Sequence, residues 1–130
     1  MIDMTKFLQG YIDAALWSTT DTRDDESELY NLDDHFARVS NICRIAMLKD
    51  CSDFVLANYH PLLAFKERTG RDDSDLGHDF WLTRAGHGAG YWDRGAGALG
   101  ESLSDAARVY STFEIYGDFE KGVVCSHHYG

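Results

Sequence analysis

Apolar residues near the start of the chain follow a helical pattern. Between residues 4 and 17 they recur at steps of three and four, at Phe7, Leu8, Tyr11, Ile12, Ala15 and Leu16. This spacing places them on one face of a helix, with polar residues on the opposite face. We therefore predict that an amphipathic helix opens the fold.

Two further helical segments are predicted before residue 70. The first follows Asp33 or Asp34, either of which could cap its first turn. Its apolar positions are Phe36, Val39, Ile42, Cys43 and Ala46, continuing through Cys51, Phe54 and Val55. Pro61 can open a second, short helix, because its fixed φ suits a first turn, and Gly70 suits the end of that helix. We expect a bend near Asn58 between the two.

The pattern changes after residue 74, because seven glycines fall between Gly77 and Gly100 with aromatic residues beside them. The runs DFWLTR and YWDR are typical of two short strands, and the intervening AGHGAG supplies turn residues, so we predict a β-hairpin. Residues 99–110 have helical spacing, and FEIYGD with GVVCSHHY predicts a second hairpin. The expected fold is an α+β single domain over residues 1–130, with N-terminal helices packed on a small, mainly antiparallel sheet of two hairpins separated by a helix.

Composition and charge restrict the classes of partner. The formal net charge of −10 over 130 residues disfavours direct binding to nucleic acid or to an anionic membrane. No apolar run approaches the roughly 20 residues that span a bilayer, and no leader-type segment is visible. Three cysteines without CxxC spacing fit free thiols. We expect a cytoplasmic protein whose acidic surface either binds a basic partner or only maintains solubility.

Polar and aromatic residues are dense between residues 78 and 94. The candidate site residues in this segment are His78, Asp79, Trp81, Arg84, His87, Asp93 and Arg94. One interpretation is a purely structural hairpin. The other brings His78 and His87 together, with Asp79 or Asp93 orienting an imidazole or joining a metal site. Neighbouring residues of a strand point to opposite sides, which argues against a metal pair formed by His78 and Asp79.

The run GHDFWLTRAGHGAGYWDRG, followed by a helix and a two-stranded segment, resembles a motif of small uncharacterised proteins encoded by tailed bacteriophages. The resemblance covers roughly residues 75–118. It implies an origin in a phage or prophage, and therefore an accessory or host-interference role. It brings no established activity and no catalytic residue.

Two other groups of residues carry weaker chemical signals. Cys125, His127 and His128 could hold zinc, but their spacing matches no standard finger and at most two of them would share a face of a strand. A nucleophilic pair of Cys43, Cys51 or Cys125 with a histidine lacks the flanking residues typical of such enzymes. We predict neither a metal nor a cofactor.

Three functions remain open, and the sequence favours the first. It is a phage-type inhibitor that binds a basic surface of a host nucleic-acid-handling protein, such as a CRISPR complex or a restriction enzyme, in the bacterial cytoplasm. The expected contacts are Asp21, Asp24, Asp25, Glu26, Glu28, Asp72, Asp73 and Asp75, with Tyr30, Tyr91 and Trp92 as aromatic anchors. The second is a small metal-dependent or hydrolytic enzyme, with His87 as base or ligand and Arg84 or Arg94 binding an anionic substrate. The third is a virion-assembly or scaffolding protein. The oligomeric state is left open.

Overall fold

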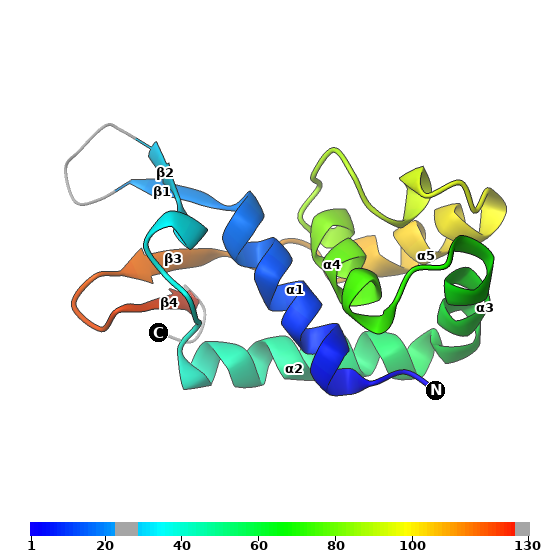
Figure 1. The fold of residues 1–130 in the computed structure, drawn as a ribbon, viewed down its shortest axis with the longest axis horizontal. Helices are drawn as coiled ribbons and strands as arrows, with labels where there is room; N and C mark the ends of the chain where they lie inside the picture. Colours follow the sequence, from blue (N-terminus) through cyan, green and yellow to red (C-terminus); the bar gives the residue numbers. More distant parts are fainter. Residues whose placement is uncertain (23–28, 127–130) are drawn as a thin grey trace.

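The computed structural model describes residues 1–22 and 29–126 (Figure 1). Five α-helices lie within these ranges: α1 Met4–Ser18, α2 Asn41–Ala57, α3 Tyr59–Thr69, α4 Asp73–Arg84 and α5 Ala98–Arg108. The strands are β1 Thr20–Thr22, β2 Leu29–Asn31, β3 Ile115–Asp118 and β4 Val123–Ser126, and two 3-10 turns are η1 Leu32–Asp34 and η2 Tyr91–Asp93. None of the described helices is both long and apolar enough to cross a membrane.

Three of the helices and the two hairpins occupy opposite ends of the molecule. Figure 1 shows α3, α4 and α5 at one end and both hairpins at the other, with α1 and the long α2 running between them. Each sheet is an antiparallel pair, β1 with β2 and β3 with β4, and Val39 joins the second sheet through a bridge to Val124. The α+β class is therefore confirmed, as are the predicted closing hairpin and the helices that begin the chain.

The core is organised around a close crossing of α1 and α4. Gly10 of α1 lies against the carbonyl of Ser74, and Gly77 of α4 lies against the carbonyl of Phe7. A Cβ atom at either glycine would collide with those backbone atoms, so the two helices approach as closely as backbone allows. The approach lets the Tyr11 ring pack on Phe80, 5.3 Å between ring centroids.

Capping residues decide where the helices start and stop. The Asp3 carboxylate accepts hydrogen bonds from the first-turn N–H groups of α1, and the Ser40 hydroxyl accepts one from Cys43 at the start of α2. The prediction that Asp33 or Asp34 caps α2 is wrong, because both lie in η1. Gly70 ends α3 in the left-handed conformation, as predicted.

The hairpin predicted from DFWLTR and YWDR is also wrong, because residues 73–84 form α4 and residues 91–93 form η2. A reciprocal capping box starts this helix: the Asp72 side chain accepts from the Asp75 N–H, and the Asp75 side chain accepts from the Asp72 N–H. The helix is buried on several sides, at Leu76, Asp79, Phe80, Trp81, Leu82, Thr83 and Arg84. Burial around most of the circumference removes the amphipathic spacing by which a helix is recognised in a sequence.

We expect Gly77→Ala to destabilise the fold by about 3 kcal/mol or more, because the added methyl group must push α1 away from α4. The measurement is urea unfolding followed by circular dichroism. Gly88→Ala is the matched control, since a Cβ at Gly88 meets no atom within 4 Å. Equal losses in the two variants would contradict the proposed role of the helix crossing.

Candidate functional site

Asp79, one of the predicted site residues, is a buried structural carboxylate. Its side chain has no exposed surface, and it accepts hydrogen bonds from Arg71 at 3.0 Å and Arg94 at 2.7 Å. Two charge-assisted bonds compensate the cost of burying the charge. Asp79 thereby connects α4 to the segment that precedes it and to the loop after η2. The same bonds engage the Arg94 guanidinium within the fold.

Arg84 is a second buried connection. Its guanidinium donates to the Asp50 carboxylate at 2.8 Å, the Tyr11 hydroxyl at 3.0 Å, and the carbonyls of Tyr110 and Ser111 at 2.8 and 2.7 Å. These partners come from α1, α2 and the segment after α5. Burial raises the pKa of Tyr11, so its hydroxyl stays neutral and can accept the bond from Arg84. Arg84 is therefore part of the fold rather than an anion-binding group.

The aromatic residues of the motif are also largely internal. Trp81 donates its indole N–H to the hydroxyl of Ser18, and the Thr83 hydroxyl accepts from the N–H of Tyr91. The Tyr91 hydroxyl donates to the carbonyl of Leu76 at 2.7 Å. The prediction of Tyr91 as an exposed anchor is wrong, because the ring is fully buried between α3 and α4. Trp92, by contrast, is exposed.

The two histidines of the motif do come together, through a residue of α1. The ring of Trp17 lies 5.9 Å from His78 and 5.7 Å from His87, measured between ring centroids. Burial lowers the pKa of His78, although the nearby Asp79 carboxylate acts in the opposite direction. Asp93 is exposed and lies 3.9 Å from Arg94. Within residues 1–22 and 29–126, no group of three histidine, cysteine or acidic side chains could hold a metal.

The predicted acidic contacts have different surroundings. Asp24, Asp25, Glu26 and Glu28, like His127 and His128, lie outside the described residues. Asp73 is buried and bound by Lys66 at 2.6 Å, so its prediction as an exposed contact is wrong. Burial would raise the pKa of Asp73, but the hydrogen bonds from Lys66 and the Asp3 N–H outweigh it and lower that pKa.

The remaining predicted contacts have structural roles in addition to whatever surface they offer. Asp21 accepts a hydrogen bond from the Gly117 N–H at 3.1 Å, which connects the two hairpins. Asp72 and Asp75 form the capping box of α4. Tyr30 packs against His35 and Phe119. Cys125 is a buried thiol in β4.

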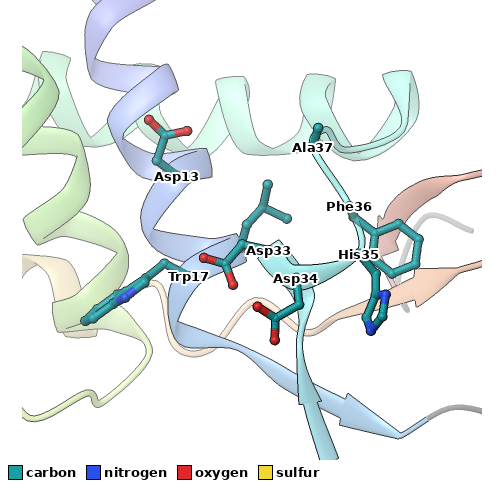
Figure 2. Close-up of a pocket in the computed structure, with 8 residues that line it drawn as sticks. Asp13, Trp17, Asp33, Asp34, His35, Phe36 and Ala37 are labelled. Atoms are coloured by element: carbon teal, nitrogen blue, oxygen red, sulfur yellow. The ribbon is translucent and has the colours of Figure 1, made fainter.

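An acidic hollow of about 600 Å³ lies between α1 and η1. Its lining residues are Asp13, Leu16, Trp17, Asp33, Asp34, His35, Phe36 and Ala37. Figure 2 shows the carboxylates of Asp33 and Asp34 between the ring of Trp17 on one side and His35 on the other. Leu16 and Phe36 are buried and supply apolar surface at the base of the hollow.

The hollow suits a cationic side chain. Asp13, Asp33 and Asp34 are exposed, and no lysine or arginine is among the lining residues. Trp17 leaves 53% of its surface exposed, which is unusual for an indole. Carboxylates beside an open aromatic face can bind a guanidinium by hydrogen bonds and by cation–π contact.

Sequence reasoning missed this combination. Asp33 and Asp34 were interpreted as possible helix caps, and Asp13 and Trp17 fall on the helix that was interpreted only as a core element. Trp17 lies one position after the last apolar residue of that helix pattern. A bulky aromatic residue at a polar position was the only available signal, and nothing in the sequence placed it beside η1.

We expect Asp79→Asn to cost about 3 kcal/mol in the free energy of unfolding, because two partly buried guanidinium groups lose their fully buried carboxylate partner. Asp105→Asn is the control, since its ion pair with Arg108 is exposed and should contribute less than about 0.5 kcal/mol. Chemical denaturation at neutral pH measures both. A cost below about 1 kcal/mol for Asp79→Asn would contradict this account of the buried pairs.

Comparison with known proteins adds no further assignment. No protein-family model, no curated protein and no solved structure matches the chain.

Proposed function

We propose that this chain is a small acidic accessory protein of phage type, which inhibits a bacterial defence machine by binding its basic surface. The target would be a CRISPR complex or a restriction enzyme. The observation that carries the proposal is the hollow beside Trp17, where the exposed carboxylates of Asp13, Asp33 and Asp34 line the same hollow as a half-exposed indole ring. The phage-like motif of residues 77–95 supports the biological setting.

The partner chemistry follows from the lining of the hollow. Proteins that handle nucleic acids present arginine and lysine along the groove that tracks the phosphate backbone. An arginine from such a groove can donate to Asp33 or Asp34 while its planar guanidinium lies over Trp17. The net charge of −10 attracts the same surface at longer range and raises the rate of association.

The motif has an indirect part in this proposal. Its buried bonds fix α4 against α1, and α1 carries both Asp13 and Trp17. His78 and His87 then support the Trp17 ring from the α4 side. A ring held in place before binding loses little conformational freedom when a partner arrives, which favours affinity.

The enzyme alternative finds less support in the same contacts. Arg84 and Arg94, its candidate substrate-binding groups, both donate to internal carboxylates. His87 and His78 contact Trp17 rather than a nucleophile. No specific observation favours a virion-assembly role.

We expect an arginine-rich peptide to shift the indole N–H signal of Trp17 in an NMR titration, and the shift to weaken as salt rises. Trp17→Ala should weaken binding roughly 30-fold, equivalent to about 2 kcal/mol. The double variant Asp33→Lys, Asp34→Lys should abolish binding, because it reverses the charge of the hollow.

Asp105→Lys is the matched control, since it removes an exposed acid on α5, far along the chain from the hollow. It should reduce affinity only slightly, through the change in net charge. If Asp105→Lys weakens binding as strongly as Trp17→Ala does, the chain acts through its total charge and not through this site.

The inhibitory role is tested by expressing the chain in bacteria that carry one active CRISPR or restriction system and challenging them with a targeted phage. We expect the wild-type chain to restore plaque formation, and the double lysine variant to fail although it accumulates to the same level. Plaque formation that is unchanged in every defence system tested, with peptide binding intact, would keep the binding site and reject the inhibitory role.

A further inference from the structure

The helix α2 has a buried apolar face and an outer face on which exposed apolar side chains stand beside polar ones. Its inner face carries Cys43, Met47, Cys51 and Phe54, all buried in the core. Its outer face carries a second series at steps of three and four, in which Ile42, Ile45 and Leu56 are apolar and Lys49 and Ser52 between them are polar. This spacing is the a and d pattern by which one helix packs along another.

The outer series is unusually open to solvent. Ile42 is 56% exposed, Ile45 68% and Leu56 78%, and Leu48 at the edge of the series is exposed as well. The helix runs along the lower edge of the molecule in Figure 1. Large apolar side chains gathered on one helix face favour association, since burying them releases ordered water.

The charges of α2 favour a second copy of the same chain as the occupant. The helix holds two bases, Arg44 and Lys49, and two acids, Asp50 and Asp53, so its formal charge is zero within a chain of charge −10. Two copies that met through most other surfaces would repel each other, whereas these helices would not.

The order of residues along the helix also defines the direction of pairing. Lys49, a member of the outer series, and Asp53 beside it are equally distant from residue 51, and they form an exposed pair at 3.4 Å. A twofold axis at this level would place Lys49 of one copy beside Asp53 of the other. The same axis brings Ile45 to within one residue of Leu56 of the other copy. A parallel arrangement would instead place Lys49 beside Lys49.

We propose that the chain forms a twofold-symmetric dimer through the outer face of α2, with the two helices antiparallel and crossing near residue 51. The interface is isologous, so each residue of the series serves both copies. A single helix pair buries less area than a standard stable interface, and the dimer should therefore form in the micromolar range.

Sedimentation equilibrium of the full chain over a wide concentration range tests the association. We expect reversible dimer formation, weakened at least about tenfold by Ile45→Asp, with the circular dichroism spectrum unchanged. Val109→Asp is the control: Val109 is 82% exposed at the end of α5 and should leave dimer formation intact. A chain that stays monomeric up to its solubility limit overturns the proposal, as does equal association by the wild type and Ile45→Asp.

The charge pairs are tested with Lys49→Asp and Asp53→Lys. Each variant alone should self-associate more weakly, because it places like charges across the interface. An equimolar mixture should recover the association, since the heterodimer restores opposite charges at both contacts while the Lys49–Asp53 pair within each chain stays broken. If the equimolar mixture does not recover the association, the Lys49–Asp53 ion pair acts only within one helix, and the proposed interface is wrong.

Cross-linking tests the direction. Ile45→Cys chains mixed with Leu56→Cys chains should form a disulfide under mild oxidation, because these positions lie within one residue of each other in the antiparallel pair. Ile45→Cys alone should not, since its two sulfurs would lie about 18 Å apart along the helix axis. The native cysteines are buried, which keeps the background low. Cross-linking of Ile45→Cys alone, without the mixed product, would overturn the antiparallel arrangement.

Discussion

The close contact of α1 with α4 is the constraint on which the other parts of the structure depend. At the crossing, Gly10 and Gly77 let the two backbones approach to a distance that no side chain would permit. That approach brings the Tyr11 hydroxyl within 3.0 Å of the Arg84 guanidinium and allows Trp81 to bond to Ser18 at the end of α1. Trp17, one residue earlier, is thereby fixed beside His78 and His87. The candidate site thus depends on a backbone contact made nearer the other end of the same helices.

The buried charges of the core each bind several segments of the chain. Asp79 and Arg84 both belong to α4, both are buried, and each is satisfied by more than one partner from other segments. A buried charge with several hydrogen bonds specifies one arrangement of its neighbours, since any other arrangement leaves a charge unpaired at a cost of several kcal/mol. The glycine-rich loop after α4 contains little regular structure, and the bonds of Arg94 and Tyr91 hold it against the helices. Polar residues that in the sequence indicate chemistry serve here to fix the path of the chain.

The limits of the sequence reading have physical causes. Helix α1 could be predicted because it keeps an exposed stripe along one side, so its buried apolar residues repeat at helical steps. The same argument failed for α4, where apolar, charged and aromatic residues are buried on several sides, and it failed for the start of α2, where Ser40 and not an acid is the cap. The fold class and the closing hairpin at Gly122 could be predicted from the sequence, because turn residues separate two short apolar runs there. The hollow could not be predicted from the sequence, since only the fold brings Asp13 and Trp17 to the same surface as Asp33 and Asp34.

The two proposed surfaces differ in chemistry, and the difference bears on how they would act together. The proposed binding at the hollow would act through charge, so salt would screen it, whereas the proposed dimer face of α2 combines exposed apolar side chains with a formal helix charge of zero, so salt should affect it less. The hollow is built from α1, η1 and the residues after η1, and the dimer face is built from α2. The two surfaces therefore share no residue. A twofold dimer carries two hollows on one particle. A basic groove with repeated arginines could then engage both, and the second contact would form at the high effective concentration of a tethered site. Weak individual contacts to single arginines would in this way combine into the tight binding that an inhibitor requires.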